Sequence, residues 1–86
     1  PEAEKMRVFI TGIAGVLGSS LARVFVQRGY KVVGNDIARV NEAWRIPEEV
    51  MEKISYKWKS TIDLSREDFE GVDVVVDCGI GFADRP

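Results

Sequence analysis

The stretch RVFITGIAGVLGSS occupies residues 7–20 and decides how the chain begins to fold. It opens with three consecutive apolar residues, Val8, Phe9 and Ile10, and such a short run is typical of a strand that is buried on both faces. Three glycines follow at even spacing: Gly12, Gly15 and Gly18. Apolar residues then recur at helical spacing until Gly29, where a helix can end. The stretch therefore predicts a strand, a glycine turn and a helix.

The residues that follow predict three more strands. Residues 30–35 form a second apolar run that ends on Asp36, and residues 54–59 alternate between apolar and polar side chains, as a half-solvated strand does. Residues 72–77 contain three consecutive valines and predict a fourth strand, buried on both faces.

Short helical segments are predicted between the later strands. Residues 47–53 place Pro47 at the expected first helical position, with glutamates in the first turn. Ser65 and Asp68 have the spacing of a capping box, which predicts a helical turn that closes at Gly71.

Strands that alternate with helical segments predict an α/β fold, a Rossmann-type doubly wound parallel sheet of about four strands in the order 3-2-1-4. The first two strands are then central, and the alternating third strand lies at an edge. A uniformly apolar fourth strand at the other edge would lack cover. We therefore expect further strands beyond those of residues 1–86, and we expect the isolated chain to form homo-oligomers through this edge.

The glycine turn predicts a site for a dinucleotide. Gly12 permits a sharp turn, Gly15 permits close approach of the backbone to a pyrophosphate, and Gly18 permits close packing of helix and strand. The backbone amides near Val16 and Leu17 would point at the phosphates, and the helix dipole would add to the attraction. The alternative is that the glycines only tighten a turn.

Asp36, followed by Ile37, stands where a carboxylate can accept hydrogen bonds from the adenosine ribose hydroxyls. A carboxylate there also repels a 2′-phosphate, which favours NAD as the cofactor over NADP. Arg39 leaves NADP open, because a nearby arginine can hold the extra phosphate.

Three further residues complete the predicted cofactor site. Asp63 is predicted to accept a hydrogen bond from the adenine amino group while Leu64 packs on the ring, although an aspartate is also common in an ordinary loop. Gly79, in the small-residue run 77–81, would let the cofactor pass close to the end of the fourth strand. Cys78 is read as a structural thiol, because the chain contains no histidine to activate it.

The composition excludes several classes of partner. The 86 residues carry 12 basic and 14 acidic side chains, a net charge of -2, so we expect neither nucleic acid nor an anionic membrane surface as a partner. One cysteine forms no internal disulfide and no cysteine metal cluster. No apolar run approaches the roughly 20 residues that cross a bilayer, and we expect a cytoplasmic protein without a metal.

The run from Val8 to Ser19, followed by residues 29–36, resembles the extended short-chain dehydrogenase/reductases, which are NAD-dependent sugar epimerases and dehydratases. The resemblance rests on the Thr-Gly-x-x-Gly-x-x-Gly motif, the acid after the second strand, the Asp63-Leu64 pair and the Val-Asp-Val-Val-Val run of residues 72–76. It implies hydride transfer between a nucleotide-sugar carbon and the nicotinamide of NAD, assisted by a Tyr-x-x-x-Lys pair.

Neither tyrosine of this chain fits that pair, because Tyr30 is followed four residues later by Gly34 and Tyr56 by Ser60. We therefore expect no catalytic residue in the chain itself and place the catalytic pair beyond residue 86. The resemblance implies that residues 1–86 are the N-terminal part of a dinucleotide-binding domain and that the substrate-binding part is absent from them. The family also often has His-Leu-Ala-Ala where residues 77–80 read Asp-Cys-Gly-Ile. Two alternatives remain: a sensor that binds a dinucleotide without catalysis, and a structural module without a ligand.

Overall fold

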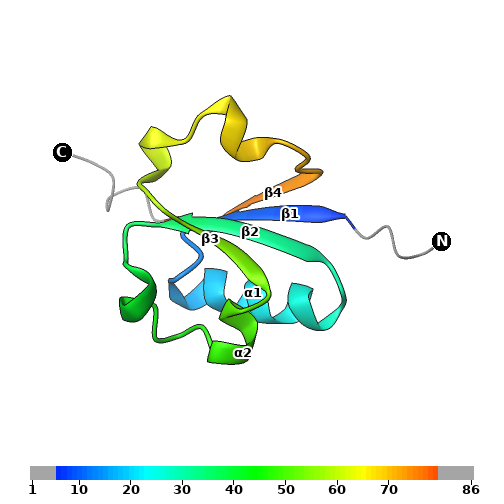
Figure 1. Ribbon diagram of the computed structural model, residues 1–86, viewed down its shortest axis with the longest axis vertical. Coiled ribbons are helices and arrows are strands. Elements are labelled where there is room, and N and C mark those ends of the chain that lie inside the picture. The colour runs from blue at the N-terminus through cyan, green and yellow to red at the C-terminus, as the bar shows by residue number, and fades with distance from the viewer. Residues whose placement is uncertain (1–5, 80–86) are drawn as a thin grey trace.

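The computed structural model describes residues 6–79 and contains one parallel sheet of four strands (Figure 1). The order is β3-β2-β1-β4, and each neighbouring pair is parallel. The strands are β1 (Arg7–Thr11), β2 (Lys31–Asp36), β3 (Ile54–Trp58) and β4 (Val74–Asp77). The predicted fold class and strand order are confirmed.

Two α-helices cover one face of the sheet, and short 3-10 helices lie over the other (Figure 1). On the first face are α1 (Val16–Gln27) and α2 (Glu48–Met51). Between β2 and α2 lies the 3-10 helix η1 (Val40–Glu42). On the second face, η2 (Thr61–Asp63) and η3 (Arg66–Phe69) connect β3 to β4.

Alternate side chains of β1 build the two halves of the core. Val8 and Ile10 are buried on the helical face, in one cluster with Ala22 of α1 and Val32 of β2. Phe9 points to the other face, where its ring centroid lies 4.6 Å from that of Phe69. Because both faces of β1 are covered, its apolar run is continuous, as predicted.

An ion-pair cluster fixes η3 to the side of β3 that carries Lys57. The Asp68 carboxylate lies 3.2 Å from the ammonium groups of both Lys57 and Lys59. Its Oδ2 also accepts a hydrogen bond from the Ser65 backbone N–H at 2.8 Å. This is the predicted pairing of Ser65 with Asp68 at the start of a helical turn.

Helix α1 ends where the sequence predicts, whereas α2 begins and ends at other residues than predicted. Helix α1 ends at Gln27, and Gly29 follows with a φ of 86°, a conformation that glycine adopts without strain. Pro47 is the N-cap of α2 rather than its first helical residue, and α2 has four residues. The prediction of a helix over residues 47–53 was too long, because the chain turns into β3 at Ile54.

The prediction that the fourth strand is buried on both faces was wrong for the described residues. Val74 is 37% exposed and Val75 is 53% exposed. Within residues 6–79, β4 pairs with β1 alone. Val74 and Val75 therefore form the uncovered apolar edge that the strand order implied, whereas Val76 packs against the core.

Candidate functional site

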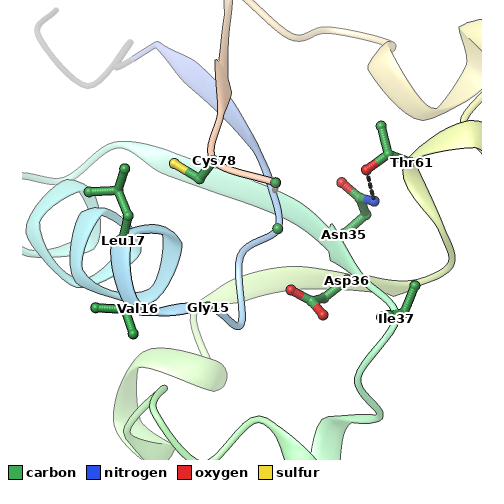
Figure 2. Close-up of a pocket in the computed structure, with 10 residues that line it drawn as sticks. Gly15, Val16, Leu17, Asn35, Asp36, Ile37, Thr61 and Cys78 are labelled. Atoms are coloured by element: carbon green, nitrogen blue, oxygen red, sulfur yellow. Dashed lines mark hydrogen bonds between the residues drawn. The ribbon is translucent and has the colours of Figure 1, made fainter. Parts of the chain in front are cut away.

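A pocket of about 480 Å³ opens at the carboxyl ends of the strands, beside the start of α1 (Figure 2). Ligand sites in proteins typically measure roughly 300 to 1,000 Å³. In a doubly wound sheet, ligands bind outside the carboxyl ends of the strands, between strands whose connections run to opposite faces. The pocket is lined by Gly12, Gly15, Val16, Leu17, Asn35, Asp36, Ile37, Thr61, Cys78 and Gly79.

Internal packing requires two of the three glycines of the turn. Gly12 has a φ of 65°, and a Cβ added there would lie 2.7 Å from the Gly79 Cα. A Cβ on Gly18 would lie 2.3 Å from the Gly12 carbonyl oxygen. Gly18 therefore packs beneath the turn and does not line the pocket, whereas Gly12 and Gly79 bring the ends of β1 and β4 together.

Gly15 is different, because nothing in the packing around it requires a glycine. Its φ of -78° is open to any residue. An added Cβ would have one close neighbour, the Gly12 carbonyl oxygen, at an ordinary contact distance of 3.5 Å. Gly15 nevertheless lines the pocket. A glycine that the fold does not need, at the wall of a pocket, fits a ligand that approaches the backbone closely.

The start of α1 offers backbone donors to that ligand. Gly15 is the N-cap and has no side chain to cap the helix, and the first turn contains no acidic residue. The first amides of a helix have no partner within it, and the helix dipole places partial positive charge there. Val16 and Leu17 are 68% and 59% exposed, so this end of the helix is accessible to an anion such as a phosphate.

The backbone orients the carboxylate of Asp36. Its Oδ2 accepts a hydrogen bond from the Ala14 N–H at 2.9 Å, and its Oδ1 accepts one from the Ala38 N–H at 3.0 Å. Ala14 belongs to the glycine turn, so the carboxylate ties the end of β2 to that turn. Each carboxylate oxygen keeps further acceptor capacity, and the group can accept hydrogen bonds from the two hydroxyls of a ribose.

Aromatic residues of β3 hold the segment after Asp36. The Tyr56 hydroxyl donates to the Ala38 carbonyl at 2.6 Å, and the Trp58 indole N–H donates to the Ile37 carbonyl at 2.9 Å. Burial raises the pKa of Tyr56 to about 12, and the charges of Asp36 and Glu42 add to the rise. Tyr56 therefore stays a neutral donor at physiological pH.

Arg39 is held outside the pocket by the same strand. Its guanidinium lies 4.4 Å from the centroid of the Trp58 ring, within the range of a cation–π interaction. Arg39 is not among the residues that line the pocket. Arg39, which could have held the 2′-phosphate of NADP, thus has Trp58 as an alternative partner at the protein surface.

A hydrogen-bonded junction closes the pocket between β1 and β4. The buried Thr11 hydroxyl donates to Asp77 Oδ1 at 2.6 Å and accepts from the Cys78 N–H at 3.1 Å. Burial and the Asp77 charge raise the pKa of the Cys78 thiol, which keeps it protonated and a weak nucleophile. Ile80 and Gly81 of the predicted small-residue run lie outside the described residues.

The structure brings most of the predicted site residues together. Gly12, Gly15, Val16, Leu17, Asp36, Ile37 and Gly79 line one pocket. Asp63 is exposed at the end of η2, and neither it nor Leu64 lines the pocket. Their role at the adenine stays a prediction.

Sequence reasoning missed two polar residues of the pocket, Asn35 and Thr61. Asn35 is 1% exposed, and its Nδ2 donates to the Lys59 carbonyl at 3.1 Å and to Thr61 Oγ1 at 3.2 Å. The sequence did offer a signal for Asn35, which stands next to Asp36 at the end of a strand with an apolar centre. Asparagine is uncommon in the buried interior of a protein, so its presence there suggests a role at the site.

Residues 6–79 contain neither a candidate metal site nor a candidate membrane span. No group of three or more His, Cys, Asp or Glu side chains there is placed to hold a metal ion. None of the helices in the same range has the length and apolarity to cross a bilayer.

The chain is similar to several known proteins that are much longer than it is. It is 41% identical over 69 residues to the UDP-N-acetylmuramate–L-alanine ligase of Syntrophomonas wolfei, covering 80% of this chain and 14% of the ligase. It is 32% identical to an NAD-dependent NDP-hexosamine 5,6-dehydratase of tunicamycin biosynthesis, with a TM-score of 0.71, covering 87% of this chain and 23% of that one.

A protein from Lactobacillus casei shares the fold, with a TM-score of 0.73 at 24% identity. This match covers 86% of our chain and 32% of the other. The chain thus spans a third or less of the length of these relatives. The model of the NAD dependent epimerase/dehydratase family matches residues 8–85, a range that includes every residue lining the pocket. The chain belongs to the NAD-dependent epimerase/dehydratase family.

Proposed function

We propose that this chain forms the NAD-binding part of an oxidoreductase that acts on a nucleotide sugar, and that the catalytic Tyr-x-x-x-Lys pair lies outside it. The observation that carries the proposal is Gly15, a pocket-lining glycine that internal packing does not require. A pyrophosphate against the backbone at Gly15 would receive hydrogen bonds from the amides that begin α1. When bound, NAD supplies the hydride acceptor, and the residues described here hold its adenosine and pyrophosphate.

Preference for NAD over NADP follows from the charges around the ribose site. Asp36 is fixed by two backbone hydrogen bonds and would face the 2′ position of the ribose. A phosphate placed against this carboxylate meets a like charge, which costs on the order of several kcal/mol. Arg39 would have to leave Trp58 to offset that cost. We therefore propose at least a tenfold preference for NAD.

The remaining parts of the proposal concern the whole protein. The solved dehydratase that resembles this chain acts on an NDP-hexosamine, which supports a nucleotide sugar as substrate. We propose no nucleic-acid or membrane partner, since the net charge is -2. We propose a cytoplasmic location, since a single cysteine forms no internal disulfide and suits a reducing compartment. Self-association of the isolated chain would occur through the exposed valines of β4.

A second candidate ligand is a uridine diphosphate sugar bound directly in the same pocket. It is favoured by the 41% identity to a ligase that acts on UDP-N-acetylmuramate. Such a nucleotide also presents a diphosphate to the glycine turn, but no nicotinamide. A dinucleotide sensor without catalysis would bind NAD as the proposed oxidoreductase does, and would differ by lacking Tyr-x-x-x-Lys in its longer chain.

Isothermal titration calorimetry separates these ligands. We expect saturable binding of NAD, weaker binding of NADP, and no competition from UDP-N-acetylglucosamine at concentrations that leave NAD bound. Tight binding of the UDP sugar, with no heat from NAD, would overturn the proposal in favour of the second candidate. A folded chain that binds neither ligand would indicate a structural role for the glycine turn.

A further inference from the structure

One buried polar atom of the pocket has no partner. Asn35 Oδ1 has almost no contact with solvent and accepts no hydrogen bond in the structure, although Asn35 lines the pocket. Leaving a buried acceptor unpaired costs roughly 1 to 3 kcal/mol, and most such groups in proteins are satisfied. An unpaired acceptor in the wall of a ligand pocket therefore calls for a donor that arrives with the ligand.

The orientation of the Asn35 amide is fixed by its neighbours. Its Nδ2 donates to the carbonyl oxygen of Lys59 at 3.1 Å and to Thr61 Oγ1 at 3.2 Å. A carbonyl oxygen accepts and never donates, so turning the amide over would set two acceptors against each other. Oδ1 thus takes the other position of the amide, and in Figure 2 it lies on the side of the amide that faces Cys78.

The position of Asn35 along the pocket identifies the part of the ligand that it meets. Figure 2 shows Val16 and Leu17 at one side of the pocket and Asp36, Asn35 and Thr61 at the other, with Asn35 between Asp36 and Thr61. A nucleotide has its phosphate, ribose and base in the same order. With the phosphate at the start of α1 and the ribose at Asp36, the base comes to lie beside Asn35.

We infer that Asn35 is a specificity-determining residue that reads the base, and that its Oδ1 accepts a hydrogen bond from the exocyclic 6-amino group of adenine. This inference rests on the proposed function. The 6-amino group is the N–H donor of the adenine ring and carries two hydrogens, so the predicted contact with Asp63 could take the second. The free protein carries an unpaired acceptor, and an adenine nucleotide relieves it.

The test compares NAD with nicotinamide hypoxanthine dinucleotide, in which a carbonyl oxygen replaces the 6-amino group. That oxygen would face Asn35 Oδ1 as a second acceptor. We expect the wild-type chain to bind NAD about tenfold to a hundredfold more tightly than the hypoxanthine analogue, measured by calorimetry at constant salt and pH.

Two variants at the same position separate the acceptor from the rest of the side chain. Asn35→Leu has a similar volume without polar atoms, and we expect its preference for NAD to fall to less than about threefold. Asn35→Asp keeps an acceptor oxygen but loses the Nδ2 donor, and we expect it to retain the preference. Circular dichroism and thermal unfolding check that each variant is folded, and the wild-type ratio stands as a test even if neither variant folds.

The outcomes distinguish this inference from the proposed function. If wild-type chain binds both dinucleotides with equal affinity, NAD binding stands and base reading by Asn35 is overturned. The same conclusion follows if Asn35→Leu keeps the full preference for NAD. If the folded wild-type chain binds neither dinucleotide, the proposed function fails and the inference fails with it.

Discussion

Substitution of Gly15 by alanine separates a glycine needed for a ligand from a glycine needed for the fold. The added Cβ would lie 3.5 Å from the Gly12 carbonyl oxygen, which is ordinary contact, and the φ of -78° suits alanine. Alanine at a compatible position restricts the unfolded chain and stabilises by about 0.4 to 1 kcal/mol, whereas alanine is a poorer N-cap than glycine by a similar amount. The free energy of unfolding should therefore change by less than about 1 kcal/mol.

Binding should respond differently. The methyl group would stand between the backbone and a bound pyrophosphate, and the loss of one charge-assisted hydrogen bond costs roughly 1.5 to 3 kcal/mol. This corresponds to an increase in the Kd for NAD of about tenfold to 150-fold. Calorimetry measures the Kd, and urea denaturation measures the free energy of unfolding on the same sample.

The matched control is Gly18→Ala. Its Cβ would lie 2.3 Å from the Gly12 carbonyl oxygen and 2.8 Å from the Ile13 Cα, so backbone atoms would have to move. We expect this variant to lose several kcal/mol of stability or to fail to fold. The reasoning is refuted if Gly15→Ala binds NAD with wild-type affinity, or if it is as unstable as Gly18→Ala.

Three further perturbations test the charges and the open edge. Asp36→Ala should weaken NAD binding by roughly 1.5 to 3 kcal/mol and lower the NAD-to-NADP affinity ratio; unchanged affinity for both in calorimetry would remove the role of Asp36. The hydrogen bond from the Ser65 N–H lowers the pKa of Asp68 most, and the hydrogen bonds from Lys59 and Lys57 add to this effect. Together they lower that pKa from 3.8 to about 2. The stabilisation from Asp68 is thus complete above about pH 4 and is lost as the pH falls toward 2. In thermal unfolding, the Tm of Asp68→Asn should therefore fall less steeply than that of the wild type between about pH 4 and about pH 2. The same steepness in both proteins would contradict this. Val75, 53% exposed on β4, should support concentration-dependent self-association that Val75→Lys abolishes, whereas a wild-type chain that sediments as a monomer at high concentration would count against it.

The parts of the fold that depend on local chemistry could be predicted from sequence. The run from Val8 to Ile10 is apolar because β1 is covered on both faces, and Gly29 ends α1 because its positive φ suits glycine. The burial of β4 could not be predicted, since it depends on which strands lie beside it rather than on its own three valines.

The candidate site likewise contains residues that could be predicted from the sequence and residues that could not. The glycine turn and Asp36 have a spacing with a known chemical reason, and the structure places them in one pocket. Asn35 lies near the end of β2 and Thr61 begins η2, just after β3. They share no motif, and the pairing of β2 with β3 brings these segments together. The hydrogen bonds of Asp36 to Ala14 and Ala38 likewise depend on the turn geometry.

Binding of NAD at the glycine turn is tested most directly by nuclear magnetic resonance of the isotope-labelled chain during titration with NAD. We predict saturable shifts of the backbone amides at Gly15, Val16 and Leu17, together with the side-chain amide of Asn35, while the amides of η3 on the far face stay unchanged. Saturable shifts confined to other surfaces, or an unchanged spectrum of the folded chain at millimolar NAD, would contradict it.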